Sequence, residues 1–253
     1  MSWGFNAWGG INEGLYDSWE KDKKVAKTIL ETENMDFYEA PIVLEGGSIH
    51  VDGQGTLITT KECLLNKNRN PQFSKKEVEE ILKKYCGVKK IIWLEYGFYN
   101  DETNGHIDNI FSFVKPGVGL INWTDDRNDP NYSVSRQIMA VLEKERDAEG
   151  RYLEIIKVIQ PTINLISKSD SSGIIKNPGT YPRNEGDRLT ASYINYYRDR
   201  DFILLPFFGN KTEDLTTYNL FSKTFPDSTI ISVYSREIIL GGGGIHCITL
   251  NQP

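Results

Sequence analysis

The sequence lacks the features that mark membrane-spanning, secreted and nucleic-acid-binding proteins. No apolar run reaches the roughly 18 residues of a spanning helix, and the opening MSWGFNAWGG has neither the basic start nor the apolar run of a signal peptide. The net charge is −6 without a block of like charge, and nucleic acid binding would call for a basic stripe. We therefore expect no membrane and no nucleic acid partner.

Cysteine and histidine are also scarce, with three of each. The cysteines are Cys63, Cys86 and Cys247, and none belongs to a Cys-x-x-Cys pair or a histidine-rich cluster. An odd, sparse set without a secretory signal indicates reduced thiols in a cytoplasmic protein. We expect no metal and no cofactor.

What the sequence does contain is one pattern, hairpin–helix–strand, that recurs three times. Residues 74–86 illustrate its helix: Ser74 and Glu77 form a capping box, and Val78 and Leu82 lie on one helical face. Another helix is predicted over residues 17–32, capped by Asp17. The pattern predicts one repeated-unit α/β domain over residues 1–253; an ordinary sheet of alternating strands and helices is the alternative. The predicted hairpins, helices and strands cover residues 37–60, 74–86 and 89–96, then 106–123, 133–148 and 152–159, then 191–208, 216–226 and 229–235.

Unusual residues fall where the units begin. Glu45 precedes Gly-Gly in EGGS, His106 and Asp108 belong to GHID, Asn195 ends ASYIN, and Cys247 ends GGIHC. Alternate residues of a strand share a face, so His106 and Asp108 are predicted to point the same way. If the units pack around a common axis, these strand starts converge on one pocket. Each residue alone has a structural interpretation, but together they are a set for nucleophilic catalysis, and the carboxylates favour a cationic substrate.

Five segments carry a family resemblance: FNAWGG, LEGGSIHVDGQGT, NDETNGHIDN, RLTASYINYY and GGGGIHCIT. They resemble the agmatine deiminase family, a branch of the guanidino-group-modifying pentein enzymes that also includes bacterial-type peptidylarginine deiminases. The resemblance runs from Trp3 to the last residues, in the family's order. It implies a pentein-type α/β propeller, which in the family has five blades.

The resemblance also implies residue roles. Cys247 would attack the guanidinium carbon of a small cationic substrate, and Asp108 would hold the guanidinium nitrogens. His106 would protonate the departing ammonia and then activate water, while Glu45 would orient His106 and keep it protonated. The implied reaction converts agmatine and water to N-carbamoylputrescine and ammonia, without a cofactor.

Three further residues have weaker assignments. Asn195 and Trp8 are candidates for substrate binding, Trp8 through a cation–π wall or else as a core residue. Trp3 is predicted to lie in the core. His246 is predicted to be structural, because His106 already fills the acid–base role and strand alternation would turn His246 away from Cys247.

One family motif does not occur. Family members carry, before FNAWGG, a motif of the form Arg-Asp-x-Gly-Pro whose aspartate is a second guanidinium clamp. We expect the propeller to be incomplete at the N-terminus, with an exposed edge that invites a homo-oligomer. An incomplete record of a full enzyme is favoured over a true start at Met1. The alternatives are a deiminase of peptidylarginine or other guanidino compounds, and a truncated interaction protein without activity.

Overall fold

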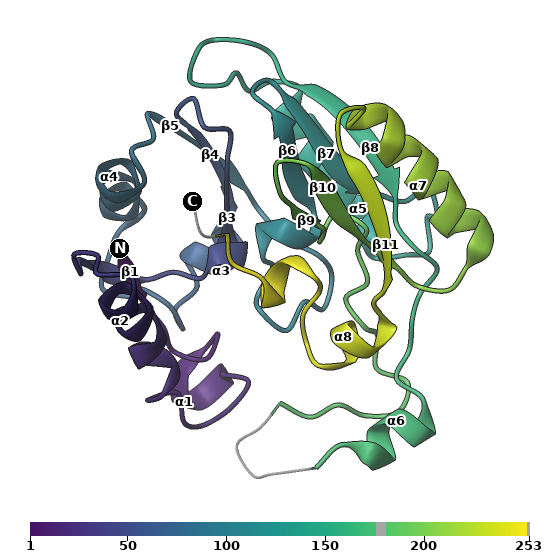
Figure 1. Cartoon of the computed structure of the whole chain (residues 1–253), viewed down its shortest axis with the longest axis horizontal. Coiled ribbons are helices and arrows are strands. Elements are labelled where there is room, and N and C mark those ends of the chain that lie inside the picture. Colours follow the sequence, from purple (N-terminus) through teal and green to yellow (C-terminus); the bar gives the residue numbers. More distant parts are fainter. Residues whose placement is uncertain (176–180, 252–253) are drawn as a thin grey trace.

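Three copies of one supersecondary unit account for most of the chain (Figure 1). The computed structural model describes residues 1–175 and 181–251. In each unit an antiparallel strand pair is followed by a helix and by a third strand parallel to the second, so the second strand is always central. The recurring unit predicted from the sequence is therefore confirmed. The elements are β3 (Ile49–Val51), β4 (Thr56–Thr60), α4 (Lys75–Cys86) and β5 (Lys90–Leu94); β6 (Phe111–Lys115), β7 (Val118–Trp123), α5 (Asn131–Leu142) and β8 (Glu154–Ile159); β9 (Tyr197–Arg198), β10 (Phe202–Phe207), α7 (Lys211–Thr224) and β11 (Thr229–Tyr234).

The first unit shows why these residues adopt these elements. Asp52 accepts backbone N–H bonds from Gln54 and Thr56 and so closes the predicted turn between β3 and β4. Helix α4 begins with the predicted capping box at Ser74 and buries Val78 and Leu82. The hydrophobic spacing of the helix thus fixes the face that packs against its sheet.

The central strand β4 is buried along its whole length, although its sequence, TLITT, is rich in threonine. Buried hydroxyls need partners, and the threonines find them in segments that lead to the unusual residues. Thr59 donates to the carbonyl of Ser48 at 2.7 Å, and Thr60 donates to the carbonyl of Gly105 at 2.7 Å. The strand therefore anchors both the EGGS and the GHID segments.

A fourth, two-stranded sheet is formed by β1 (Ser2–Gly4) and β2 (Glu39–Val43), which pair in parallel across helix α2 (Asp22–Thr32). The prediction that this helix starts at Asp17 is wrong. Residue Lys21 precedes the first helical residue without a side-chain cap, and the preceding residues form turns. The remaining elements are α1 (Gly10–Glu13), α3 (Lys61–Leu64), α6 (Lys168–Gly173), α8 (Arg236–Leu240) and the 3-10 turns η1 (Gly46–Ser48), η2 (Ile107–Asn109) and η3 (His246–Ile248).

The predicted strand starts are tight turns, and this corrects the sequence-based assignment. His106 directly precedes η2, Cys247 lies within η3, and Asn195 lies in a turn before β9. The first strands of the second and third units begin only at Phe111 and Tyr197. A turn concentrates several side chains at one point, whereas a strand spreads them over two faces.

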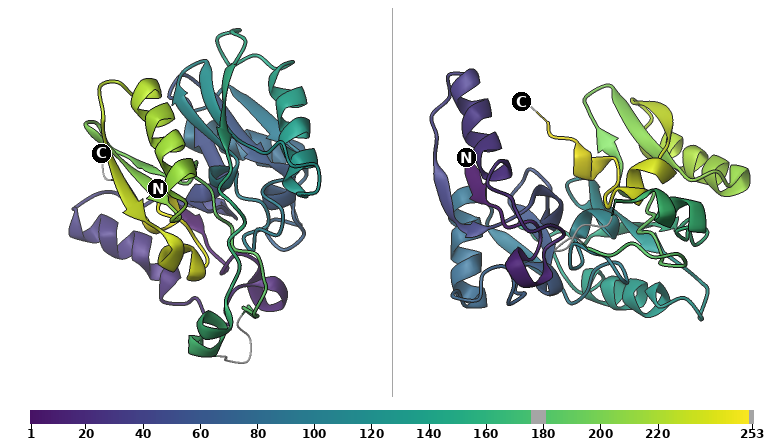
Figure 2. Two further views of the ribbon diagram at one scale, coloured as in Figure 1. Left: turned by 90° about the vertical axis from the view of Figure 1, so that its right-hand side faces the viewer. Right: turned by 90° about the horizontal axis from the view of Figure 1, so that it is seen from below.

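The four sheets lie side by side as separate small sheets. Helices α4 and α7 lie at opposite edges of the molecule in Figure 1, and Figure 2 shows the yellow C-terminal segment returning between the N-terminal part and the third unit. Within residues 1–175 and 181–251 no sheet closes on itself and no closed propeller is seen. No helix in these ranges is both long and apolar enough to cross a membrane.

The capping box of α4 yields a stability prediction. Replacing Ser74 by alanine removes the hydroxyl that accepts from the Glu77 backbone and should lower the free energy of unfolding by about 1 kcal/mol. Urea unfolding followed by circular dichroism measures this. The matched control is Lys76→Ala on the exposed face of the same helix, which should stay within about 0.5 kcal/mol. Equal stability of the Ser74 variant and the control would contradict the role of the cap.

Candidate active site

The turns that open the units meet at one place, and glycines let them approach closely. A Cβ atom on Gly47 would lie 2.5 Å from Asp108 Oδ2 and 2.7 Å from His106 Nδ1. Only glycine leaves room for both side chains. His106 and Asp108 do face one place, as the sequence predicted, but the reason is the 3-10 turn η2 rather than strand alternation.

Glycines also allow close packing around Cys247. A Cβ on Gly244 would lie 2.2 Å from Asn195 Oδ1, and one on Gly243 would lie 2.8 Å from the Cβ of Cys247. The Asn195 amide donates to Cys247 Sγ at 3.2 Å and accepts the backbone N–H of His246 at 2.9 Å. The glycine run of GGGGIHC therefore lets the last turn pack on Asn195.

The Cys247 sulfur lies beside a buried carboxylate. Although Cys247 as a residue is exposed, its Sγ is 3.4 Å from Asp108 Oδ2, and Asp108 is only 2% exposed. Burial of the sulfur and, next, the negative charge of Asp108 raise the pKa of the Cys247 thiol well above its usual value. The thiol is therefore protonated at neutral pH, and a cation bound between the two groups would favour the thiolate.

Asp108 stays ionised in this setting. Burial alone raises its pKa, but a hydrogen bond from His246 and the charge of His106 outweigh burial and lower the pKa overall. Its second oxygen, Oδ1, is buried and has no hydrogen-bond partner among the described residues. A buried carboxylate oxygen without a partner can accept a hydrogen bond from a bound ligand.

The prediction that His246 points away from Cys247 is wrong. His246 Nδ1 lies 2.9 Å from Asp108 Oδ2, the same oxygen that faces the Cys247 sulfur. Consecutive residues of the 3-10 turn η3 face one carboxylate, as strand alternation would not allow. The His246 ring stacks at 6.4 Å on His50, and a hollow of about 240 Å³ opens beside Asp108 and these two rings.

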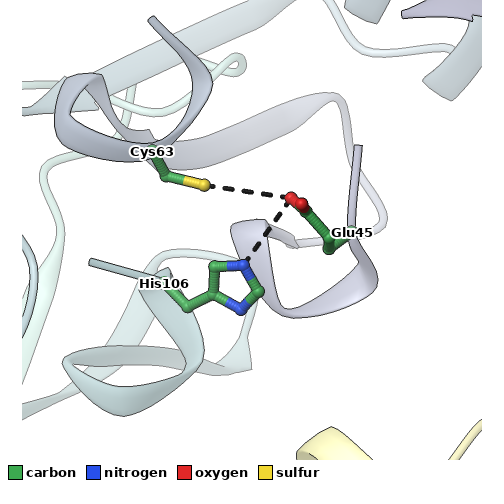
Figure 3. Close-up of side chains that lie close together, drawn as sticks. All are labelled: Glu45, Cys63 and His106. Carbon is green, nitrogen blue, oxygen red and sulfur yellow. Dashed lines mark hydrogen bonds and ion pairs between the residues drawn. The ribbon is translucent and has the colours of Figure 1, made fainter. Parts of the chain in front are cut away.

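Glu45, Cys63 and His106 form a second buried group (Figure 3). His106 Nε2 is 3.6 Å from Glu45 Oε2, and the Cys63 sulfur is 4.0 Å from the same oxygen. Sequence reasoning found Glu45 and His106 but missed Cys63, which comes from helix α3 and has no motif of its own. It also missed Arg69, which donates from Nε to Glu45 Oε1 at 2.7 Å.

The electrostatics of this group favour an imidazolium. Burial raises the pKa of Glu45, but His106 and Arg69 outweigh it, so the carboxyl is ionised. Burial lowers the pKa of His106, yet Cys63 and Glu45 more than offset burial, and the pKa of His106 is raised well above its ordinary value. Because burial raises the pKa of the Cys63 thiol and keeps it neutral, Glu45 is the partner that sustains the charge.

The same three side chains are of the types that bind a divalent metal, since their ligand atoms all lie within 4.8 Å of one another. The Arg69 guanidinium, however, already occupies one oxygen of Glu45. A metal would have to share that carboxylate with a fixed cation, so the donor set fits a proton on His106 better than a metal.

The two N-terminal tryptophans take different places. Trp3 packs edge-to-face on Tyr85 at 5.9 Å beside the first unit's core, as predicted. Trp8 packs edge-to-face on Phe5 at 5.0 Å and Tyr16 at 6.0 Å. The structure thus places Trp8 in an aromatic cluster of the N-terminal segment, and its contact with a substrate stays a prediction.

The histidine electrostatics can be tested directly, because the chain has three histidines. Burial and then the charge of His246 lower the pKa of His50 to about 4, whereas that of His106 is raised. Between about pH 5 and about pH 7, where an unperturbed imidazole titrates, His50 should therefore stay neutral and His106 should stay charged. The measurement is NMR of the ring C–H signals, assigned with His50→Gln and His106→Gln variants. Titration of both rings near the ordinary value of about 6.5 would refute this electrostatic picture.

Comparisons with known proteins identify the family. The model of the Porphyromonas-type peptidyl-arginine deiminases matches residues 1–253. The agmatine deiminase of Medicago truncatula is 47% identical over 255 residues, which cover 100% of this chain and 68% of that protein. These matches extend over every segment that forms the site.

Comparison with solved structures points to the same family. An agmatine deiminase of Enterococcus faecalis has a TM-score of 0.93 at 42% identity, covering 97% of this chain and 67% of that one. A C. jejuni agmatine deiminase with substrate bound has a TM-score of 0.80 at 27% identity, covering 97% and 66%. The chain therefore belongs to the Porphyromonas-type peptidyl-arginine deiminase family, the pentein hydrolases of C–N bonds that include the agmatine deiminases.

Proposed function

We propose that this chain hydrolyses agmatine to N-carbamoylputrescine and ammonia, with Cys247 as the nucleophile. One observation carries the proposal: the Cys247 sulfur lies 3.4 Å from Asp108, and His106 lies against the same glycine, Gly47, as Asp108 does. A nucleophile, an anionic clamp and a charged acid thus converge on one point. Relatives named as agmatine deiminases, at 42% to 47% identity over nearly the whole chain, support agmatine as the substrate.

Asp108 would bind the guanidinium. Its unpaired Oδ1 accepts one guanidinium N–H, and the charge-assisted bond offsets the cost of keeping a buried carboxylate. Asn195 holds the Cys247 sulfur from the other side by its amide. The substrate carbon would then lie next to a sulfur whose position is already set.

Substrate binding would also activate the nucleophile. Without substrate, Asp108 opposes ionisation of Cys247. A guanidinium placed between them neutralises Asp108 and favours the thiolate, and the thiol proton leaves to solvent. The reactive form would exist mainly when a cationic substrate is bound.

The chemistry would then proceed in two stages. The thiolate forms a bond to the guanidinium carbon, and the His106 imidazolium gives its proton to the departing nitrogen, which leaves as ammonia. A thiouronium remains on Cys247. His106, now neutral, takes a proton from water as the water oxygen attacks the same carbon. The C–S bond then breaks, the hydroxyl proton of the adduct passes to the departing sulfur, and the ureido product leaves.

We also propose that the three units are blades around a common axis, as in a pentein propeller. Contacts between the turns that open successive units support this arrangement. They include Asn195 to Asn109 at 3.0 Å, and the turn η3, which follows the third unit, adds the contact of His246 with Asp108 at 2.9 Å.

The first test is ammonia release from agmatine, free arginine and an arginine peptide. Wild type should release ammonia fastest from agmatine, and Cys247→Ala should release none, because the variant lacks the sulfur that would form the C–S bond. Cys86→Ala is the matched control, since Cys86 is a half-buried thiol at the end of α4. Faster ammonia release from the peptide than from agmatine would show that agmatine is not the preferred substrate. Ammonia release by the Cys247 variant would exclude Cys247 as the nucleophile.

Asp108→Asn should separate binding from thiol reactivity. Removing the negative charge should lower the pKa of Cys247, so alkylation by iodoacetamide at neutral pH should become faster. Ammonia release should nevertheless fall about 10²- to 10³-fold, the scale of losing one fixed electrostatic partner. A Cys86→Ser background restricts alkylation to Cys247, because Cys63 is buried. Slower alkylation together with unchanged release would contradict the clamp.

A further inference from the structure

We propose that Arg69 is a positioning residue for the acid–base pair, holding Glu45 in the orientation in which it supports His106. The inference rests on the proposed function, because it assigns a role to a residue that acts through His106. Arg69 belongs to the loop between α3 and α4 and appears in no catalytic motif that sequence reasoning identified.

Arg69 is buried, and each nitrogen of its guanidinium donates a hydrogen bond. Nε donates to Glu45 Oε1 at 2.7 Å, and Nη1 donates to the side-chain oxygens of Asn68 at 2.7 Å and Asn104 at 3.0 Å. Nη2 donates to the Thr103 carbonyl at 3.0 Å. A buried charge with this many partners is held in one geometry.

Three of these partners, Glu45, Thr103 and Asn104, belong to the two segments that carry the acid–base pair. Thr103 and Asn104 lie in the turn that leads into His106, and the backbone N–H of His106 is itself held by Asp101 at 3.0 Å. Glu45 directly precedes the 3-10 turn η1, which leads into the first strand of the first unit. Arg69 therefore sets where Glu45 lies relative to the His106 backbone.

The two carboxylate oxygens of Glu45 have different partners, and this shows the effect of Arg69. Arg69 takes Oε1, which leaves Oε2 to face His106 Nε2 at 3.6 Å and Cys63 at 4.0 Å. Without Arg69 the carboxylate could rotate, and it would be a buried anion whose other partners are a histidine and a neutral thiol. Arg69 thus contributes both an orientation and a charge.

Lysine can replace only one of these contributions. Its ammonium keeps the positive charge near Glu45, but it lacks the rigid fork that reaches Glu45, Asn104 and Thr103 at once. Comparing Arg69→Lys with Arg69→Gln therefore separates charge from orientation.

The experiment measures kcat and KM for agmatine across pH for the wild type and both variants. Arg69→Gln should lose at least about 10-fold in kcat, part of the ~10²- to 10⁴-fold that a positioned acid–base group supplies. KM should change little, because Asp108 is intact. Arg69 helps to lower the pKa of Glu45. Removing Arg69 raises that pKa, so as the pH falls Arg69→Gln should lose activity at a higher pH than the wild type does. Arg69→Lys should show the lower kcat with the acid limb near that of the wild type.

The matched control is Arg188→Lys. Arg188 makes a two-pronged pair with the buried Asp129, at 2.9 and 3.0 Å, outside the acid–base group. This control should leave the pH profile of kcat unchanged. If Arg69→Gln does not fold, the lowered kcat of Arg69→Lys at unchanged KM carries the test.

Failure of this inference is distinguishable from failure of the proposed function. If the wild type releases no ammonia, the proposed function is wrong, but the His106 ring signal still reports on Arg69 by NMR. That signal should shift in both Arg69 variants and stay in place in Arg188→Lys. An unchanged His106 signal, or wild-type kcat and acid limb in Arg69→Gln, would overturn the role of Arg69.

Discussion

The buried carboxylate of Asp108 is the constraint on which the site depends. One of its oxygens contacts both the Cys247 sulfur, at 3.4 Å, and the His246 ring, at 2.9 Å, while the other has no hydrogen-bond partner within the part of the chain that the structure describes. A buried anion is costly unless it is paired, so the histidines around it are part of the reason it stays charged. Burial of the Cys247 sulfur and then this charge raise the pKa of the thiol well above its usual value.

Close approach of turns makes this arrangement sterically feasible. Gly47, Gly243 and Gly244 each lie where a Cβ atom would collide with a site residue or its support. Three tight turns, η1, η2 and η3, together with the turn that carries Asn195, deliver side chains from distant parts of the chain. The turns η1 and η2 and the turn that carries Asn195 precede the first strands of the three units, whereas η3 follows the third unit.

The site has two halves with opposite electrostatic tasks. Around Asp108 the negative charge is only partly satisfied, which suits a cationic ligand. Around Glu45 the charge is paired with Arg69 by a hydrogen bond of 2.7 Å and faces His106 Nε2 at 3.6 Å, which suits a stored proton. A Cβ atom on Gly47 would collide with Asp108 and with His106, one residue of each half. This difference in pairing supports the proposal that Asp108 is the guanidinium clamp and His106 the proton donor.

The sequence alone determined the recurring hairpin–helix–strand unit, the α4 capping box and the set of residues Glu45, His106, Asp108, Asn195 and Cys247, because periodicity, caps and glycine-marked motifs are local signals. Only the tertiary structure decided that Asp108 and Cys247 lie in 3-10 turns, that helix α2 starts at Asp22, and that His246 faces Asp108. It also decided that Arg69 and Cys63 join the group, since neither carries a local pattern. Their partners are 24 and 18 residues away along the chain, and burial, charge pairing and packing between segments act only once the chain has folded.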